Sequence, residues 1–455
     1  MRITHALGWY FPDSVGGTEI YVAGLCQRLQ RDGHDVAVVA PDAAVVTPRA
    51  YQHDGVPVFR YPIPAQPTRD EAQGVVAARG TEHLIRWLRE HPTDIFHAHG
   101  VTTGVGRHEI RAARDAGART LLTHHLPSLG YICRRGTLME GGRRPCDGLV
   151  APGKCAACIL EERGVPTLAA AALAGLPVDA SRVLGTIAGK VGTTFGAAAS
   201  IAAGQAMQRE LVSVTDCMIA LNDAALSMLV ANGAPPSAVI VNRLGHSHRA
   251  LPRRATASAR LPLRVGFMGR LHPTKGVYEL ARAMTMLPRP LQVAVEIRGV
   301  IQSDVERRVE RDILAILDGD PRVTLAPAVP PDRVLDVLAG YDVLCCPSTW
   351  FENGPTVAIE AMAVGTPVIG SRLGNLAELV TDGVDGRLVA PGDAADLARA
   401  IGDLARSPAT LETWRSHLRP ARTMDEIAAD YVALYAELLA QDGPDRRELL
   451  CASAS

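Results

Sequence analysis

Two glutamates separated by seven residues mark the part of the chain whose residue types are best suited to chemistry. In the run Phe-Glu-Asn-Gly-Pro-Thr-Val-Ala-Ile-Glu, Glu352 precedes Gly354 and Pro355, and Glu360 follows within an apolar stretch. Gly and Pro there predict a turn and the start of a helix, with Thr356 and Glu360 on one face. Burying a carboxylate without donors is costly, so we expect a hydroxyl-rich or cationic group to meet Glu360.

Three further stretches lie where predicted strands end. Gly16 and Gly17 precede a predicted helix, where small residues let a ligand approach and the helix N-terminus attracts an anion. Arg270 and Lys275 follow the first strand of the second half, where two cations suit a diphosphate. His125 closes a strand of the first half, on the same side of the expected cleft. Taken singly, each stretch is also typical of an ordinary turn, a solvated loop or a structural histidine.

The elements that position these residues alternate between short β-branched runs and longer helical patterns. Such alternation predicts parallel sheets covered on both faces, with ligands beyond the carboxyl ends of the strands. We therefore predict an α/β protein with two doubly wound, Rossmann-like domains that face a cleft. The predicted strands lie near 2–9, 35–40, 56–61, 95–99, 119–124, 217–221, 239–244, 263–269, 293–299, 323–326, 342–346, 367–371 and 387–390.

Composition shifts along the chain predict where the domains meet. An N-terminal domain is expected over 1–245, with a Cys-rich and Ala-rich helical insertion at 127–212. An Arg-, Ala- and Pro-rich linker is expected over 246–262, and a C-terminal domain over 263–422. A crossover helix at 423–441 and a disordered tail at 442–455 complete the division.

Size and composition narrow the class of protein. A chain of 455 residues exceeds one ordinary core, which favours two domains. The 47 Lys and Arg residues nearly balance 48 Asp and Glu residues, which argues against a nucleic-acid partner. The N-terminus shows no signal segment and no apolar run suffices to span a bilayer, so we expect a cytoplasmic protein. Nine scattered cysteines argue against a disulfide framework.

These motifs together resemble the family 4 glycosyltransferases. The resemblance rests on Gly269-Arg270-Leu271 with Lys275-Gly276, on the two glutamates, on the Gly16-Gly17 loop, on the strand-end histidine and on residues 378–383. It extends over about 1–245 and 263–441. It implies a GT-B fold and a retaining transferase that moves a sugar from a nucleotide-diphosphate sugar to a hydroxyl acceptor. Polysaccharides, glycolipids and small metabolites are the acceptor classes considered.

The resemblance also implies roles for particular residues. Glu352 and His125 would contact the donor sugar near the reacting carbon, Glu360 would bind the ribose, and His99 would lie toward the acceptor. No catalytic metal is expected, and Asp318-Gly319-Asp320 is interpreted as a turn at the amino end of the sheet. Leu126 and Asn222 depart from the family pattern on the acceptor side. The expected donor-binding residues are Gly16, Gly17, Arg270, Lys275, Gly354, Pro355, Thr356 and Glu360.

Four cysteines within the insertion predict a metal site. Cys133, Cys146, Cys155 and Cys158 end in a Cys-x2-Cys pair, which favours a structural zinc ion. An iron–sulfur cluster, a redox pair and free thiols are the alternatives. The Ala-rich stretch that follows is expected to pack on the first domain as helices. The alternative is a helix that contacts the inner face of the membrane, and the oligomeric state is left open.

Two other functions fit the same motifs. A non-catalytic protein of this fold would use the metal knuckle as an interaction module, although the retained cations and carboxylates argue against this. A sugar-nucleotide epimerase of the same fold would need no acceptor.

Overall fold

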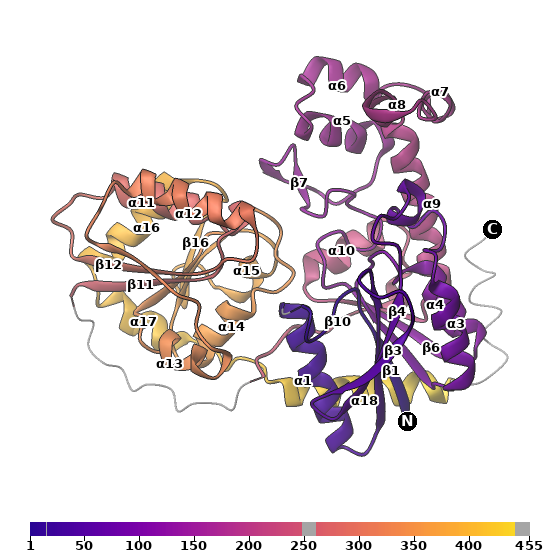
Figure 1. Ribbon diagram of the computed structural model, residues 1–455. Helices are drawn as coiled ribbons and strands as arrows, with labels where there is room; N and C mark the ends of the chain where they lie inside the picture. Colours follow the sequence, from indigo (N-terminus) through magenta and orange to yellow (C-terminus); the bar gives the residue numbers. More distant parts are fainter. Residues whose placement is uncertain (15, 248–260, 442–455) are drawn as a thin grey trace.

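The computed structural model describes residues 1–14, 16–247 and 261–441, which form two α/β domains (Figure 1). The predicted doubly wound architecture is confirmed, because each domain is built on its own largely parallel sheet. The first sheet has the strand order β10-β9-β6-β5-β1-β2-β4-β3. Its strands are β1 (Arg2–Ala6), β2 (Asp35–Asp42), β3 (Arg49–His53), β4 (Val56–Pro62), β5 (Ile95–His99), β6 (Arg119–Thr123), β9 (Cys217–Ala220) and β10 (Val239–Val241).

The second sheet is parallel throughout and has the order β13-β12-β11-β14-β15-β16. Its first strand lies in the middle, with one crossover on each side, so the carboxyl end of that strand is the switch point where ligands bind. Each predicted strand of this half is confirmed. The strands are β11 (Leu263–Arg270), β12 (Val293–Val300), β13 (Val323–Ala326), β14 (Val343–Cys346), β15 (Val368–Ser371) and β16 (Gly386–Val389).

One strand of the first sheet was not predicted. β3 pairs antiparallel with β4 across a two-residue turn at Asp54 and Gly55. Both residues have positive φ, 49° and 79°, as the tight hairpin turn requires. The Asp-Gly dipeptide was the available signal, but the exposed residues of β3 lack a buried apolar face.

Helices cover both sheets, and a separate group of helices extends beyond the carboxyl edge of the first sheet (Figure 1). The first domain carries α1 (Gly17–Arg31), α2 (Arg69–Ala72), α3 (Thr81–Glu90), α4 (Arg107–Asp115), η1 (Pro236–Ala238) and α10 (Asp223–Ala231). The insertion contains the hairpin β7 (Met139–Glu140) and β8 (Arg144–Pro145), and α5 (Pro152–Glu162), α6 (Thr167–Ala174), α7 (Val178–Leu184), α8 (Gly189–Phe195) and α9 (Ala197–Val214). The second domain carries η2 (Pro273–Lys275), α11 (Val277–Met286), α12 (Asp304–Leu317), η3 (Pro331–Arg333), α13 (Val334–Leu338), α14 (Thr356–Ala363), α15 (Gly374–Leu379), α16 (Ala394–Arg406) and α17 (Thr410–His417).

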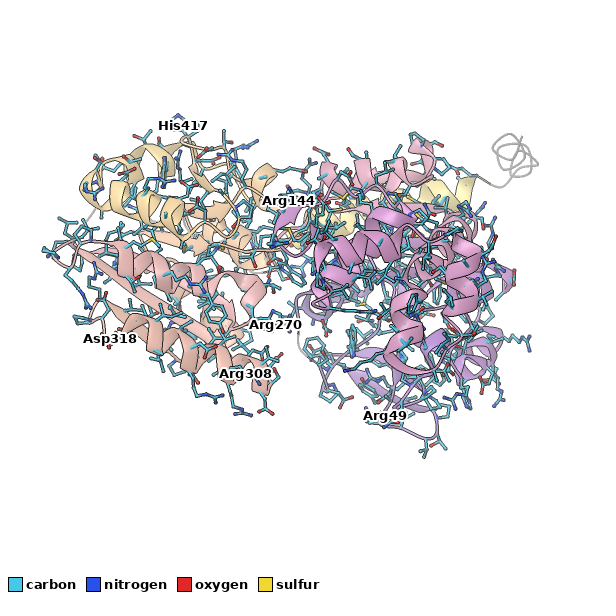
Figure 2. The ribbon with its side chains drawn as sticks, turned by 90° about the horizontal axis from the view of Figure 1, so that it is seen from above. Arg49, Arg144, Arg270, Arg308, Asp318 and His417 are labelled. Atoms are coloured by element: carbon cyan, nitrogen blue, oxygen red, sulfur yellow. The ribbon has the colours of Figure 1, made fainter. Side chains whose placement is uncertain are left out.

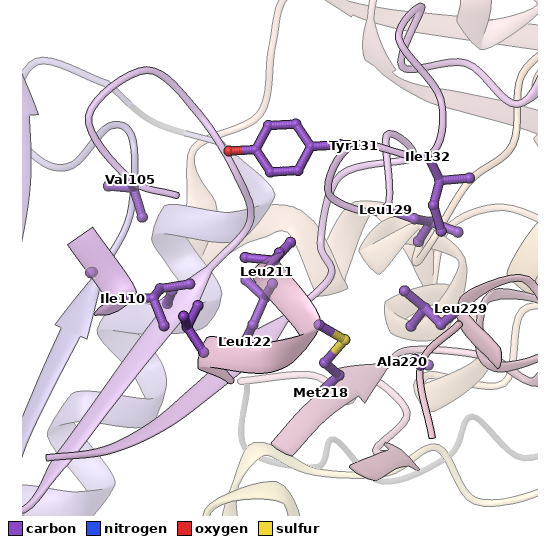
Figure 3. Packing of buried hydrophobic residues seen from close by; sticks show 14 of the residues in the cluster. Val105, Ile110, Leu122, Leu129, Tyr131, Ile132, Leu211, Met218, Ala220 and Leu229 are labelled. Carbon is purple, nitrogen blue, oxygen red and sulfur yellow. The ribbon is translucent and has the colours of Figure 1, made fainter. Parts of the chain in front are cut away.

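The insertion is anchored on the first sheet through apolar packing. Leu211 of α9 and Leu129 of the preceding loop are fully buried in one cluster with Leu122 of β6 and Met218 of β9 (Figure 3). Burying each such side chain contributes about 1.5–3 kcal/mol. Helices α5, α7 and α8 then pack on α9, and α6 packs mainly on α5.

The last described helix, α18 (Met424–Ala440), returns to the first domain and packs on α1. Tyr431 and Tyr435 of this helix are fully buried beneath the first sheet. The Tyr435 hydroxyl lies 2.7 Å from His97 Nδ1, which joins α18 to β5. His246, assigned from sequence to the linker, is buried and accepts a backbone bond from Met424; residues 248–260 and 442–455 lie outside the described ranges.

None of the described helices is by itself long and apolar enough to cross a bilayer. Two short helices, α6 and α7, meet the length and composition test only as a pair, and they are bent by 105° relative to each other.

Candidate active site

The site in the second domain is built from two loops that are joined to each other. The first is the turn η2, which follows β11, and the second is the loop after β14. Thr349 N donates to Thr274 O at 2.9 Å, which ties the two loops together. Gly276 has φ of +73°, and a Cβ there would lie 1.7 Å from the carbonyl oxygen of Pro347. Only glycine allows this approach, so Gly276 fixes where Lys275 points.

Glu352 and Lys275 form a partly buried ion pair in this site. Lys275 Nζ lies 2.6 Å from Glu352 Oε1. The same oxygen accepts hydrogen bonds from Ser348 Oγ at 2.8 Å and from Trp350 Nε1 at 2.9 Å. Among the described residues, none donates to Oε2 of Glu352. The carboxylate is thus held by one oxygen and presents the other to a ligand.

The remaining donor-side residues surround this pair at the domain boundary. Arg270 ends β11 and is exposed, and Figure 2 shows it on the side of its domain that faces the first domain. Pro355 was predicted to be an early residue of the helix, but it is the N-cap of α14. Thr356 is the first residue of the helix. Glu360 lies half-buried one turn further along α14. A Cβ at Gly354 would lie 2.0 Å from Leu244 of the first domain, so glycine lets the domains approach.

The first domain contributes a row of hydrogen-bonded histidines from three adjacent strand ends. His99 Nδ1 lies 3.1 Å from His125 Nε2, and His99 Nε2 lies 2.9 Å from His5 Nδ1. Burial lowers the pKa of His5 and His125 to about 3 and that of His99 well below its usual value. All three imidazoles are therefore neutral at physiological pH. His99 is buried between the other two, so the expectation that it faces the acceptor is not supported by its position.

Because each imidazole is neutral, each carries one N–H, and the donor and acceptor of each hydrogen bond in the row can be assigned. The Nε2 atom of His5 is buried without a partner among the described residues. A buried acceptor without a partner is better tolerated than a buried N–H without one. His5 Nδ1 therefore donates to His99, and His99 Nδ1 donates to His125 Nε2. His125 then carries its own hydrogen on Nδ1, as a donor.

Helix α1 brings its first turns against these histidines. The Tyr21 ring meets the His125 ring edge-on, with centroids 4.8 Å apart. Gly16 is the N-cap of the helix and Gly17 its first residue. A Cβ at Gly16 would lie 2.8 Å from Glu19 Oε2. The chain's own carboxylate thus lies beside the helix start where we expected a ligand anion.

Three side chains for which the sequence predicted no role between the domains join them beside the site. Asn353 Nδ2, from the second domain, donates to His124 O at 3.0 Å. Asn222 Nδ2 donates to Asn353 O at 3.4 Å. Glu378 accepts the backbone N–H groups of residues 223 and 224, both at 3.1 Å, at the N-terminus of α10. The glutamate thus complements the helix dipole of the other domain.

The Asp-Gly-Asp sequence has no part in the site. Asp318 is the C-cap of α12 in a left-handed conformation, and Asp320 pairs with Arg322 at 2.7 Å. Figure 2 shows Asp318 at the far end of the second domain from Arg270. Its interpretation as a turn is confirmed.

The four cysteines of the insertion line one small cavity of about 40 Å³. All four are free thiols. Backbone N–H groups donate to the sulfurs of Cys158, Cys133 and Cys146 at 3.2, 3.4 and 3.4 Å. The segment also reaches the donor site, because Phe351 N donates to Thr137 O at 3.1 Å.

Two protein families match the two domains. The profile described as "Glycosyltransferase Family 4" matches residues 15–169, and that described as "Glycosyl transferases group 1" matches residues 253–419. Together the two matches cover more than half of the chain.

Curated relatives align over part of their length. A D-inositol 3-phosphate glycosyltransferase of Nocardia farcinica is 37% identical over 162 residues, which are 33% of this chain and 36% of the relative. An MMP alpha-(1->4)-mannosyltransferase of Mycolicibacterium hassiacum is 32% identical over 174 residues, 37% of this chain and 41% of the relative. The chain therefore matches well under half of the length of each.

Solved structures resemble the whole fold at low identity. Sucrose-phosphate synthase from Thermosynechococcus elongatus aligns with a TM-score of 0.63 and 19% identity, covering 97% of this chain and 100% of that chain. Anabaena HepE in complex with UDP-glucose aligns with a TM-score of 0.58 and 16% identity, covering 97% and 99%. These similarities establish the two-domain fold.

Proposed function

We propose that this chain, which belongs to the family 4 glycosyltransferases of the GT-B fold, transfers a sugar from a nucleotide-diphosphate sugar to a hydroxyl acceptor with retention of anomeric configuration. The observation that carries the proposal is the Lys275–Glu352 pair at the switch point of the second sheet, next to Asn353, whose side chain bonds to His124 of the first domain. Relatives of known name that share part of the chain are glycosyltransferases.

The cations stabilise the leaving group in the proposed reaction. Cleavage of the glycosyl–phosphate bond builds negative charge on the diphosphate, and preorganised donors stabilise that charge. Lys275 uses one of its three N–H bonds on Glu352 and has two left for phosphate oxygens. Arg270, which has no carboxylate partner among the described residues, adds a fork of donors. Two such cations supply the electrostatic stabilisation without a metal ion.

The sugar and the nucleoside are recognised by the acceptors and donors around them. Glu352 Oε2 accepts hydrogen bonds from donor-sugar hydroxyls, and Glu360 accepts those of the ribose. His125 donates from Nδ1 to the sugar beside the reacting carbon. We assign His99 and His5 to holding that ring in place, since both are buried behind it.

A screen of nucleotide sugars by thermal shift tests the proposal. A ligand that binds the folded state raises the apparent melting temperature, by an amount that grows with its concentration over Kd. At least one nucleotide sugar is expected to do so and to be consumed when acceptors are added. Arg270→Ala should weaken that donor about tenfold or more, whereas Arg311→Ala, an exposed arginine of α12, should not. If no donor shifts the melting temperature or is consumed, the proposal fails.

We also propose that the four cysteines hold a structural metal centre. Burial raises the pKa of Cys146 and Cys155, so metal binding must displace their protons. Four thiolates around one zinc ion lie roughly 3.8 Å apart, given Zn–S bonds of about 2.3 Å. In the described part of the chain, the ligand atoms of His5, His97 and His99 lie within 4.8 Å of one another. No three of the four thiols come that close together. Binding one zinc ion would draw the sulfurs together. Zinc is the metal we propose, with an iron–sulfur cluster as the alternative.

Elemental analysis of the full chain, purified without air, decides between the two metals. A cluster predicts about four iron and four sulfide per chain and a broad visible absorbance. Cys155→Ser should lose the bound metal. Cys26→Ala, which removes a thiol of α1 away from the cavity, should keep it. Stoichiometric zinc without iron is the expected result, iron with sulfide would replace zinc by a cluster, and no metal at all would overturn the metal centre.

A further inference from the structure

A large polar cavity lies between the insertion and the first domain, and the donor chemistry does not use it. Its volume is about 390 Å³, enough for a small organic ligand. It opens beside the histidine row: Val101 to Thr103 follow the strand that ends in His99, and Ser128 lies three residues after His125. We call it the arginine cavity, because its charged wall residues are Arg69, Arg134, Arg135, Arg163 and Glu162.

The arginines outnumber their counter-ions. Arg135 pairs with Glu162, the one acidic residue of the wall. Arg69, Arg134 and Arg163 have no carboxylate partner among the described residues. Three unpaired guanidinium groups on one cavity give it a positive potential, which concentrates anions from solution.

Arg134 shows that this charge is confined. Its side chain is half-buried, and its one hydrogen bond in the described structure goes from Nη1 to Gln73 O at 3.4 Å. Burial and the nearby charge of Arg69 lower the pKa of Arg134, while Tyr131 opposes them. An unpaired, partly desolvated cation is unfavourable in the empty protein. An anion that entered the cavity would relieve that cost.

Two wall residues favour a ligand that also carries hydroxyl groups. Thr102 and Ser128 have buried hydroxyls without hydrogen-bond partners among the described residues. A buried polar atom left without a partner costs about 1–3 kcal/mol. Thr102 Oγ1 packs against Gly8, so a ligand in the cavity gains from that deficit once these hydroxyls rotate toward it.

We propose that the arginine cavity binds the acceptor through a phosphate group, so that the enzyme glycosylates a hydroxyl compound that bears phosphate. The planar fork of arginine matches the oxygens of phosphate in a bidentate manner. The inference rests on the proposed function, since only a transferase has an acceptor. The phosphate belongs either to a soluble sugar phosphate or to a phospholipid headgroup, and the test separates these sources.

Calorimetric titration of the full chain tests the proposal, with glucose 6-phosphate as the charged probe and glucose as its neutral match. We expect glucose 6-phosphate to bind and glucose not to bind detectably, with affinity that falls as salt is added. Arg134→Met should weaken binding about tenfold, as should Arg69→Met. Arg86→Met, an exposed arginine of α3 outside the cavity, should change nothing.

The Arg69 variant covers the case in which the half-buried Arg134 variant does not fold, because Arg69 is exposed. In a second arm, vesicles of phosphatidylcholine with and without phosphatidylinositol are sedimented with the protein. Binding of the soluble probe alone assigns a soluble acceptor, and pelleting that needs phosphatidylinositol and both arginines assigns a lipid-borne one.

Any of three results would overturn the inference. The first is equal binding of glucose and glucose 6-phosphate. The second is an unchanged affinity for glucose 6-phosphate in both the Arg134→Met and the Arg69→Met variant. Donor binding, measured by the thermal shift, is independent of these results. A chain that binds nucleotide sugar but no phosphate compound in either arm contradicts the acceptor assignment and leaves the proposed function intact.

Discussion

At the scale of single residues, the proposed reaction depends on the Lys275–Glu352 pair. Glu352→Gln retains the shape of the side chain and removes its charge. Loss of one charged hydrogen bond to the donor sugar costs about 1.5–3 kcal/mol, or roughly ten- to a hundredfold in kcat/KM. The ion pair is one-quarter exposed at Lys275, so solvent limits the loss of unfolding free energy to about 1–2 kcal/mol.

Steady-state kinetics and urea denaturation measure these two effects of Glu352→Gln. Asp179→Asn is the matched control, because the Asp179–Arg182 pair is largely exposed and should contribute less than about 0.5 kcal/mol. Lys275→Met in the Glu352→Gln background should add little to the stability loss, since the pair is already broken. Additive losses would contradict direct pairing.

At the scale of elements, the strands and the helices that follow them could be predicted, because β-branched runs and helical periodicity are local signals. The loops between them could not. Ser348 and Trp350 support Glu352 only because the loop after β14 folds back on itself. The histidine row arises from strand order, which places β5 between β1 and β6. Sequence spacing alone does not reveal that His5, His99 and His125 are neighbours.

The turn η2 provides a prediction at this scale. Gly276→Ala introduces a Cβ at positive φ, which costs about 1–2 kcal/mol, and a collision with the Pro347 carbonyl. Gly383→Ala meets the same φ strain at +77° but has nothing within 4 Å of its Cβ. Gly276→Ala should therefore lose clearly more unfolding free energy and should weaken donor binding.

Urea denaturation and donor thermal shift measure both glycine variants side by side. Equal stability losses in the two variants, with unchanged donor binding in Gly276→Ala, would show that the joint between the two loops does not position Lys275.

At the scale of the whole molecule, buried neutral histidines make stability depend on pH. Burial lowers the pKa most strongly at five histidines: His5, His97, His99, His124 and His125. Below their usual value of about 6.5, the unfolded chain takes up protons that the folded chain does not. Stability should therefore fall as pH drops from about 6.5 toward 3, by up to about 1.4 kcal/mol per pH unit for each histidine.

Thermal unfolding between pH 8 and pH 5 measures this effect before carboxylates begin to titrate. The melting temperature should change little above pH 7 and fall steeply below pH 6. A flat profile down to pH 5 would mean that the histidines are accessible to protons in the folded protein.

The contacts between the domains were the least predictable part of the molecule. Phe351 of the second domain is buried in the core of the first, beside Leu138 of the insertion. Asn353 and Glu378 bond to the first domain within the same region. These contacts join residues more than a hundred positions apart, so no local sequence pattern predicts them. They place the donor site, the histidine row and the cysteine segment at one boundary.

The central claim is that this boundary transfers a sugar with retention. Its most direct test is a proton NMR time course of the nucleotide sugar that the screen identifies, recorded with the enzyme and either an acceptor or water. The first product should carry the same anomeric configuration as the donor, and Glu352→Gln should slow its appearance. An inverted anomer, or an epimerised donor without transfer, would contradict it.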